Sequence, residues 1–280
     1  MQRVRLCFVL SLFFVCAPTL AFKAELLASG DKVLARPHDL VLDKQGQRLY
    51  VTDMENDRIA VLHPETLKLL FTFGDNELAK PHDIVFDERG RILVADTGND
   101  RIAIYEIDGN KAKRIGEYKD KLSWIEGVAT TVDGTVYATN VGDGSAVKLV
   151  NGKAQAHITG ADENSGRFIR PHDIHVWKDK VYVADPGRNR IQIFDRDLQP
   201  LRKLEANFKE PKYMEVDSRG WLYVADQHNN VIKIFDENEK LILTFGKDEL
   251  NLPEGVEVRG DRIWISDTYN DRVVLYKLSQ

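Results

Sequence analysis

Residues 25–37 read ELLASGDKVLARP, and residues 69–81 read LLFTFGDNELAKP. In both stretches an apolar segment runs into a glycine that stands seven residues before the final proline. Gly246 and Pro253, near the end of the chain, keep the same spacing. The beginning of the chain therefore has the form of a segment that, elsewhere in the sequence, ends an internal repeat.

Six such repeats follow one another along the chain. They can be anchored on one position each, and the anchors are separated by 44, 44, 46, 40 and 42 residues: Pro37, Pro81, Ile125, Pro171, Pro211 and Pro253. This period is typical of propeller blades. Each repeat contains short segments such as DIVFD, ILVAD and RIAIYEI, and most end on a fourth such as LKLLFTFG. Short β-branched and aromatic segments between Gly, Asp and Asn turns predict four-stranded antiparallel sheets.

The sixth repeat ends after its third strand, RVVLYKL at residues 272–278. The strand it lacks is supplied by residues 25–37, because these match the end of the first repeat. The sequence therefore predicts an all-β fold: a six-bladed β-propeller of four-stranded antiparallel blades, its ring closed by the N-terminal strand. Closure of this kind removes the free edges of a sheet.

The first 21 residues have the features of a secretory signal. They begin with MQRVR, continue with apolar residues 6–16 and end on the small-residue segment APTLA. An apolar run of this length is shorter than the roughly 20 residues that span a bilayer, and no later segment is long or apolar enough. We expect cleavage after Ala21, a single mature propeller domain at residues 22–280, and an exported protein, periplasmic or extracellular.

Composition limits the possible partners and chemistry. Cys7 and Cys16 both lie in the signal segment, so the mature domain has no disulfide and no thiolate ligand or nucleophile. Without Arg3 and Arg5 the formal net charge changes from −5 to −7, and the positive charges are dispersed. We therefore expect no nucleic-acid binding and no membrane span, and we expect a monomer.

The tripeptide Pro-His-Asp occurs three times, at residues 37–39, 81–83 and 171–173. First strands of a propeller line the central channel, so the residue after each anchor should lie near the axis. Around the ring this position holds His38, His82, Glu126, His172, Lys212 and Glu254. Neutral imidazoles with a carboxylate suit zinc, iron or manganese. We predict that His38, His82, His172 and Glu126 converge at one mouth of the channel and bind a divalent metal, zinc favoured.

An alternative is that repeat duplication copied these residues as structural turns, and Lys212 either repels a cation or binds an anionic substrate. The position after each histidine holds Asp39, Asp83 and Asp173. These carboxylates could fix the histidine tautomers or bind a second ion such as calcium.

Other recurring residues have expected structural roles. The aspartates that close the second strands should cap turns and form ion pairs between blades: Asp53, Asp96, Asp185, Asp226 and Asp267. Four tryptophans on or beside strands should pack between blades: Trp124, Trp177, Trp221 and Trp264.

Three segments carry a family resemblance: ILVADTGNDRIAIY from residue 92, VYVADPGRNRIQIF from residue 181 and LYVADQHNNVIKIF from residue 222. This pattern resembles the NHL repeat, and the resemblance covers residues 37–280 almost from end to end. NHL-type propellers serve as protein-binding, RNA-binding and enzymatic domains, so the resemblance implies the fold more specifically than the function.

The Pro-His-Asp tripeptide also resembles one enzyme of this fold, the peptidyl-α-hydroxyglycine α-amidating lyase, a zinc-containing six-bladed propeller that splits an α-hydroxyglycine peptide into a peptide amide and glyoxylate. The resemblance implies zinc at the three histidines, calcium near Asp39, Asp83 or Asp173, and a catalytic tyrosine at Tyr269. That family spreads its zinc histidines over alternate blades, whereas here they occupy blades one, two and four. Its catalytic arginine directly follows a second-strand Asp, so Arg170 or Arg36 would have to replace it here.

Two classes of function follow. The first is a secreted recognition module with a divalent metal, which holds a peptide, glycan or protein ligand at the channel face. The second is a metal-dependent lyase of the amidating type, or a related hydrolase, in which a metal polarises water or a substrate oxygen.

Overall fold

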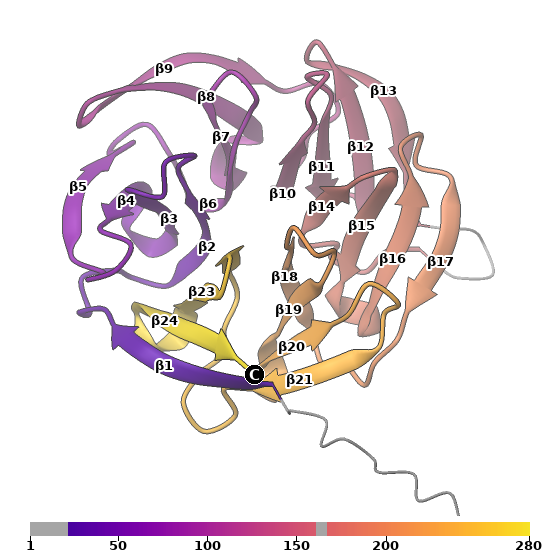
Figure 1. The fold of residues 1–280 in the computed structure, drawn as a ribbon. Helices are drawn as coiled ribbons and strands as arrows, with labels where there is room; N and C mark the ends of the chain where they lie inside the picture. The colour runs from indigo at the N-terminus through magenta and orange to yellow at the C-terminus, as the bar shows by residue number, and fades with distance from the viewer. Residues whose placement is uncertain (1–21, 161–166) are drawn as a thin grey trace, which may run out of the picture.

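The computed structural model describes residues 22–160 and 167–280, which form six four-stranded antiparallel sheets arranged around a central axis (Figure 1). The predicted signal peptide, residues 1–21, lies outside the described residues. None of the helices in the described part of the chain is long and apolar enough to cross a membrane.

The first three blades are continuous in sequence. Blade one contains β2 (Pro37–Leu42), β3 (Leu49–Asp53), β4 (Arg58–Leu62) and β5 (Leu69–Phe73). Blade two contains β6 (Pro81–Phe86), β7 (Ile92–Asp96), β8 (Arg101–Asp108) and β9 (Lys111–Tyr118). Blade three contains β10 (Ile125–Thr130), β11 (Val136–Asn140), β12 (Ser145–Val150) and β13 (Lys153–Ile158).

The last three blades include the joint between the two ends of the chain. Blade four contains β14 (Ile174–Trp177), β15 (Lys180–Asp185), β16 (Arg190–Asp195) and β17 (Pro200–Leu204). Blade five contains β18 (Pro211–Val216), β19 (Leu222–Asp226), β20 (Val231–Phe235) and β21 (Leu241–Phe245). Blade six contains β22 (Val256–Arg259), β23 (Arg262–Asp267), β24 (Arg272–Ser279) and, as its outermost strand, β1 (Lys23–Ser29).

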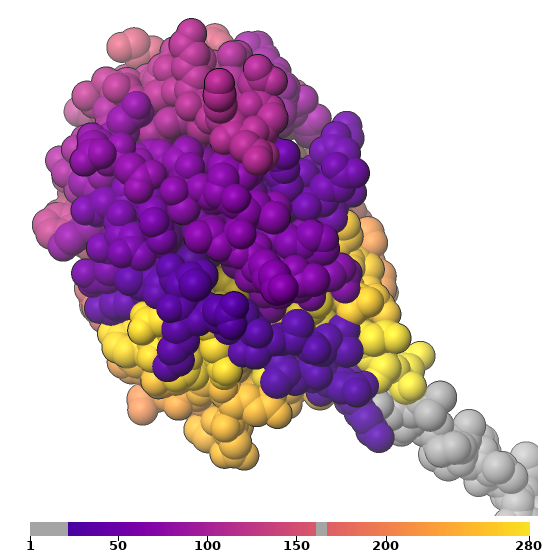
Figure 2. Space-filling view, turned by 90° about the vertical axis from the view of Figure 1, so that its left-hand side faces the viewer, coloured from indigo at the N-terminus to yellow at the C-terminus, as the bar shows by residue number. Residues whose placement is uncertain are grey.

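The N-terminal strand closes the ring, as the sequence predicted. β1 pairs antiparallel with β24, from Lys23 opposite Ser279 to Ser29 opposite Val274. Figure 1 shows the C-terminus beside β1, and Figure 2 shows the indigo N-terminal segment against the yellow C-terminal one. The predicted all-β six-bladed fold is therefore confirmed.

Apolar layers between neighbouring blades form the core. One layer joins Leu40 and Leu49 of blade one to Trp264 and Leu275 of blade six, all of them buried. Trp264 also donates a hydrogen bond from its indole nitrogen to the carbonyl of Pro64 at 2.8 Å. Trp177 and Trp221 pack at similar layers, but Trp124 is 54% exposed, so its predicted packing role is wrong.

Short 3₁₀ turns follow the second strands of five blades: Met54–Asn56, Thr97–Asn99, Pro186–Arg188, Gln227–Asn229 and Thr268–Asn270. The aspartate before each turn is fully buried. Asp53, for example, accepts hydrogen bonds from the backbone N–H of Ala35 (2.6 Å) and from Nε of Arg58 (2.8 Å). Both partners belong to the same blade or to the loop that enters it. The ion pairs therefore hold each blade together internally, and the prediction that they join blades is wrong.

A β-bulge at the start of the first strand sets the direction of the channel side chains. In blade one, Pro37 pairs with Asp53 and Leu40 with Val51, so two residues of β2, His38 and Asp39, lie opposite one residue of β3. Blade two shows the same shift between Pro81 and Ile84. A bulge interrupts the alternation of a strand and redirects its side chains. As a result, consecutive His and Asp residues can both face the channel.

Two glycines allow this close packing around the axis. A Cβ atom added to Gly127 would lie 2.6 Å from the carbonyl oxygen of His172, and one added to Gly255 would lie 2.4 Å from that of His38. Real Cβ atoms do not come this close to other heavy atoms. Blades three and six therefore carry Gly where three other blades carry Asp.

Ring closure gives the first testable prediction. Deletion of residues 22–31 from the mature domain leaves β24 with an unpaired edge. We expect the melting temperature, followed by circular dichroism, to fall by roughly 10 °C, equivalent to about 3–4 kcal/mol, and size-exclusion chromatography to show aggregation. Identical melting curves for residues 22–280 and for the truncated chain would show that β1 is dispensable.

Candidate functional site

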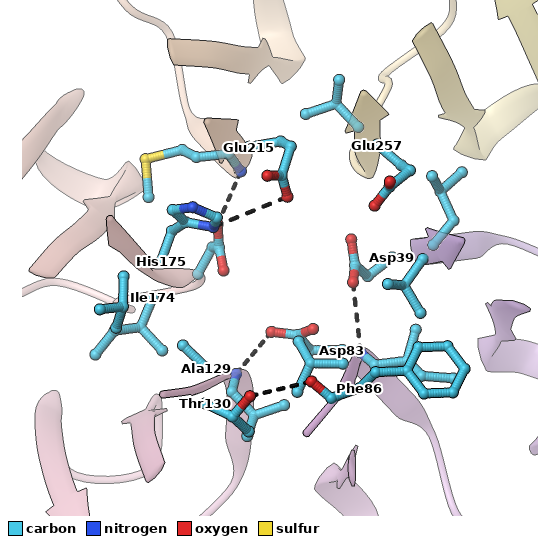
Figure 3. Close-up of a pocket in the computed structure, with 18 residues that line it drawn as sticks. Asp39, Asp83, Phe86, Ala129, Thr130, Ile174, His175, Glu215 and Glu257 are labelled. Atoms are coloured by element: carbon cyan, nitrogen blue, oxygen red, sulfur yellow. Dashed lines mark hydrogen bonds and ion pairs between the residues drawn. The ribbon is translucent and has the colours of Figure 1, made fainter. Parts of the chain in front are cut away.

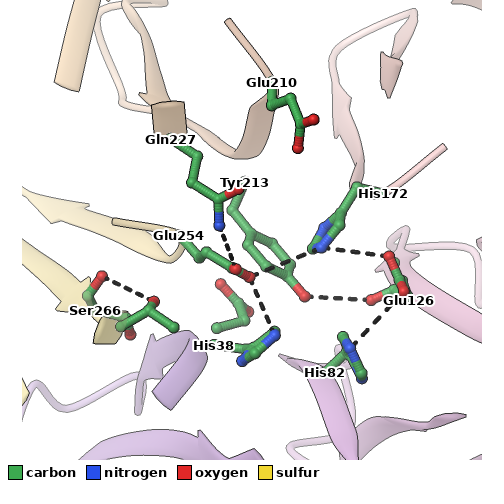
Figure 4. Close-up of polar contacts among 12 residues, drawn as sticks. His38, His82, Glu126, His172, Glu210, Tyr213, Gln227, Glu254 and Ser266 are labelled. Carbon is green, nitrogen blue, oxygen red and sulfur yellow. Dashed lines mark hydrogen bonds and ion pairs between the residues drawn. The ribbon is translucent and has the colours of Figure 1, made fainter. Parts of the chain in front are cut away.

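Three imidazoles meet at one mouth of the channel. His38 lies on β2, His82 lies on β6, and His172 lies just before β14; each is at most 8% exposed. The ring centroids of His38 and His82 are 4.6 Å apart, and those of His82 and His172 are 6.2 Å apart. The structure thus brings together the three histidines that the sequence singled out (Figure 4).

Backbone carbonyls determine the tautomers of two of these histidines. Nδ1 of His38 lies 3.0 Å from the carbonyl oxygen of Arg36, and Nδ1 of His82 lies 2.8 Å from that of Lys80. A carbonyl only accepts, so each Nδ1 carries a proton, and Nε2 of the neutral ring presents a lone pair. The prediction that the neighbouring aspartates fix the tautomers is therefore wrong for His38 and His82.

Two glutamates complete the cluster. Nε2 of His38 lies 3.2 Å from Glu254 Oε2, and Nε2 of His172 lies 3.7 Å from the same oxygen. Glu126 lies 3.3 Å from Nε2 of His172 and 3.8 Å from Nε2 of His82. The five side chains therefore form a continuous chain of contacts, His38–Glu254–His172–Glu126–His82, which we call the His/Glu cluster.

Polar atoms of the cluster lack a hydrogen-bond partner. Oε2 of Glu254 and Nδ1 of His172 are buried and have none in the described structure. The other oxygen of Glu254 accepts a hydrogen bond from Gln227 Nε2 at 2.5 Å. Oε2 of Glu254 and the Nε2 lone pair of His38 face each other, and two such groups repel unless a positive species lies between them. The geometry thus calls for a proton or a metal ion at this point.

Burial strongly affects protonation in the cluster. It lowers the pKa of His38 and of His82 to about 3 and lowers that of His172 as well. The ammonium of Lys212 contributes in the same direction for all three rings. Burial also raises the pKa of Glu126 to about 7, with Lys212 opposing that rise. The imidazoles are therefore neutral near pH 7, which is the form that binds metals.

The separations within the cluster agree with those of metal ligands. Two ligand atoms that each lie about 2.1 Å from a tetrahedral ion are roughly 3.4 Å apart. The four N–O separations in the cluster span 3.2 to 3.8 Å. Within residues 22–160 and 167–280, however, no group of three or more His, Cys, Asp or Glu is arranged so that it could hold a metal ion. The side chains would therefore have to move before they could share one ion.

The three aspartates lie in a different part of the channel. Asp39, Asp83 and Asp173 line a cavity of about 230 Å³ to which the first strands of all six blades contribute (Figure 3). Each accepts a backbone N–H from the next blade: Ile84 to Asp39 (3.4 Å), Val128 to Asp83 (2.6 Å) and Met214 to Asp173 (2.8 Å). The aspartates therefore connect neighbouring blades along the axis.

This cavity gathers further ionisable groups. His175, Glu215 and Glu257 line it too, and His175 Nδ1 lies 3.9 Å from Glu215 Oε2. Burial raises the pKa of Asp83 to about 7 and that of Glu257 to about 8, and it lowers that of His175 to about 4. Burial and the neighbouring carboxylates raise the pKa of Asp39 well above its usual value. Near pH 7, Asp39, Glu257 and His175 therefore favour their neutral forms, while a pKa of about 7 leaves Asp83 about half protonated.

Tyr269 and Arg170, the predicted catalytic pair, lie on the surface of the mouth. Tyr269 is 45% exposed, and its hydroxyl accepts a hydrogen bond from Arg36 at 2.6 Å. Arg170 forms an exposed ion pair with Glu210 at 3.2 Å. The structure therefore joins Tyr269 to Arg36, the other arginine that the sequence suggested. Both arginines stand two residues before a cluster histidine.

Sequence reasoning missed two members of this site. Glu254 stands directly after the sixth anchor, Pro253, at the same ring position as the histidines. The sequence favours Glu126 as the carboxylate ligand, because its blade lies between two histidine blades along the chain. In the closed ring blade six is also next to blade one, which brings Glu254 to His38. Gln227 directly follows a second-strand Asp, and only the structure shows that its amide reaches Glu254.

Comparison with known proteins supports the repeat assignment. Residues 78–105 match the NHL repeat. Among curated proteins none matches this chain. Solved structures are similar in fold at low identity.

Three of these structures show how similar the fold is and how low the sequence identity. A gluconolactonase from Xanthomonas campestris is 16% identical, with a TM-score of 0.71 over 92% of this chain and 90% of that one. An auxiliary nutrient binding protein from Bacteroides thetaiotaomicron is 13% identical, with a TM-score of 0.70; the match covers 92% of this chain and 77% of that one. The third is a catalytically inactive His-to-Ala variant of virginiamycin B lyase from Staphylococcus aureus with quinupristin. It is 13% identical, with a TM-score of 0.63, and the match covers 90% of this chain and 84% of that one. The likeness shows the fold alone.

The buried carboxyl of Glu257 gives a pH-dependent prediction. Its pKa is about 8 in the folded state and about 4.3 when unfolded, so the folded protein holds the proton more tightly. This contribution is fully present below the unfolded pKa and is lost as pH rises towards 8, by at most about 1.4 kcal/mol per pH unit.

Urea unfolding of the wild type and of Glu257→Gln in chelator at pH 6, 7 and 8 tests this expectation. The stability of the wild type relative to the variant should fall as pH rises. The exposed Glu205→Gln is the control and should follow the wild type. Parallel pH curves for the wild type and Glu257→Gln would contradict the raised pKa.

Proposed function

We propose that this protein is an exported ligand-binding NHL-type propeller that holds a divalent metal ion, zinc favoured, in the His/Glu cluster. One observation supports this most strongly: the Nε2 lone pair of His38 faces the unpartnered oxygen of Glu254 at 3.2 Å, with no hydrogen-bond donor between them. A divalent cation satisfies both atoms at once.

His38, His172 and Glu254 would hold the ion, and His82 and Glu126 would be further donors for it. When bound, the ion would supply a Lewis acid that polarises a ligand or water oxygen. The carbonyls of Arg36 and Lys80 keep two imidazoles in the tautomer that a metal requires. The oxygen donors of Asp39, Asp83 and Asp173 are of the type that calcium binds, and we propose the channel cavity as its site; the ion would displace the protons that burial favours on these carboxyls.

The ligand would bind at the channel face, where the loops of six blades meet around the cluster. A peptide, a glycan or a protein loop are the candidates that a rigid disc with a polar mouth can accept. The fold itself supports a binding role, since a nutrient binding protein shares it. The signal-like segment at residues 1–21 supports a location in the periplasm or outside the cell.

Metal analysis tests this proposal. We expect residues 22–280, purified and dialysed near pH 7, to contain or take up about one zinc per chain, and chelation to remove it. The double variant His38→Ala/His172→Ala should lose the zinc and keep its β-rich circular dichroism spectrum. His63→Ala/His157→Ala, at two exposed or half-exposed histidines, should keep it. A wild-type chain that binds neither zinc, iron, manganese nor calcium would exclude the metal site.

A second candidate function is a metal-dependent lyase of the amidating type. The observation that favours it is the Arg36–Tyr269 hydrogen bond beside the cluster, which places a phenol and a guanidinium at the mouth. A lyase whose His-to-Ala variant is inactive also shares the fold. In the reaction, the substrate hydroxyl would give up its proton, its carbon would become a carbonyl as the C–N bond breaks, and the nitrogen would take a proton.

Release of glyoxylate from an N-benzoyl-α-hydroxyglycine substrate tests the lyase. If the protein is such an enzyme, zinc-loaded protein should release glyoxylate and chelation should stop it. Tyr269→Phe and Arg36→Met should lower kcat by roughly 100-fold or more, typical of lost acid–base or charge stabilisation. Tyr118→Phe, at a tyrosine on the outer strand β9, should not. Absence of glyoxylate with zinc-loaded wild type would leave the binding function.

A further inference from the structure

Six residues with a left-handed backbone surround the channel mouth, one before the first strand of each blade. Their φ angles lie between 47° and 56°: Arg36, Lys80, Trp124, Arg170, Glu210 and Leu252. We call this set the rim. None of them is glycine, the residue that adopts this conformation at no steric cost. Five of them precede proline, which itself favours an extended conformation at the residue before it.

Turns of the preceding blades hold the rim in place. The backbone N–H of Lys80 donates to Asp57 Oδ1 at 2.7 Å, and that of Glu210 donates to Asn189 Oδ1 at 2.9 Å. Equivalent bonds join Arg36 to Asp271 and Leu252 to Asn230. The conformation is thus fixed by the ring, and non-glycine side chains are kept there although a glycine would fit more easily.

Only some of the charged side chains at the mouth have an ion-pair partner. Arg170 pairs with Glu210 of the rim, and Arg36 with Glu55 at 3.6 Å. Nε of Arg36 is nevertheless buried without a hydrogen-bond partner. In the part of the chain that the structure describes, no ion pair is recorded for Lys80 or for Lys212, although Lys212 stands at the same ring position as the cluster histidines and is half-buried.

An unpaired, half-buried ammonium next to a cluster of neutral imidazoles needs a negative partner. Among the described residues, neither cluster carboxylate forms an ion pair with it: Glu254 and Glu126 contact the imidazoles, although the charge of Lys212 opposes the rise that burial causes in the pKa of Glu126. The missing partner would therefore come from a ligand. Trp124 adds a flat apolar surface at the same rim, and its side chain is 54% exposed.

We propose that the mouth selects a ligand that carries an oxyanion, a carboxylate or a phosphate, next to an aromatic or apolar group. Lys212, with Arg36 and Arg170 of the rim, binds the oxyanion, and Trp124 packs against the apolar group. This inference rests on the proposed function in one respect: the metal ion of the His/Glu cluster would bind the same ligand. The cationic residues and the tryptophan are not ligands of that ion, so the two proposals can be tested separately.

Calorimetry with three small probes tests the inference on zinc-loaded and on chelator-treated protein. Hippurate carries an aromatic ring and a carboxylate, phenyl phosphate a ring and a phosphate, and hippuramide is the neutral analogue of hippurate. We expect at least one anionic probe to bind 10-fold or more tightly than hippuramide. Its affinity should fall as the sodium chloride concentration rises from 50 to 500 mM, because salt screens the charges. The preferred anion identifies the ligand class. Equal binding of all three probes, or binding of none, would overturn the inference.

Variants assign the roles. Lys212→Met should weaken binding of the preferred probe at least 10-fold while the zinc content stays the same, whereas Lys203→Met, at an exposed outer-strand lysine, should change neither. Trp124→Gly should weaken binding about threefold or more without lowering the melting temperature, because glycine fits the left-handed position. Lys212→Met that binds as the wild type does would refute the inference. A wild type that takes up no zinc would instead refute the metal proposal, and the Lys212 comparison would still decide the inference on that protein.

Discussion

The pairing of β1 with β24 is the interaction on which the rest of this structure depends. Each blade buries apolar side chains on both faces, so every blade needs two neighbours. Blade six has its second neighbour only when the chain closes into a ring, and its sheet is complete only with the N-terminal strand. The His/Glu cluster needs the same closure, since His38 and Glu254 come from blades one and six.

Much of this architecture could be predicted because the repeat converts sequence position into position on a ring. Equivalent residues of six blades must lie at equivalent radii, so Pro-His-Asp in three blades had to bring three imidazoles near one axis. The circular match between residues 25–37 and 69–81 predicted closure for the same reason. The structure places His38, His82, His172 and Glu126 together, while the metal itself stays a prediction.

Details below the level of the repeat could not be predicted in this way. In a regular strand, His38 and Asp39 would point in opposite directions, and only the bulge opposite Thr52 allows both to face the channel. The sequence has no marker for this bulge. From the sequence, the aspartates are therefore expected to fix the histidine tautomers or to bind a second ion. In the structure they connect blades instead. Glu254 was undervalued because neighbours in a closed ring are distant in sequence.

The energetics of the mouth explain why such a site would be kept. Lone pairs of His38 and Glu254 that face each other, left-handed rim residues without glycine and an unpaired Lys212 each destabilise the folded chain. By contrast, the apolar layers between the blades consist of buried, closely packed side chains. A cation between the lone pairs and an oxyanion beside Lys212 would remove two of these penalties together. Their charges are opposite, so each ligand would strengthen the binding of the other, and a protein that uses both would bind its organic ligand most tightly when the metal is present.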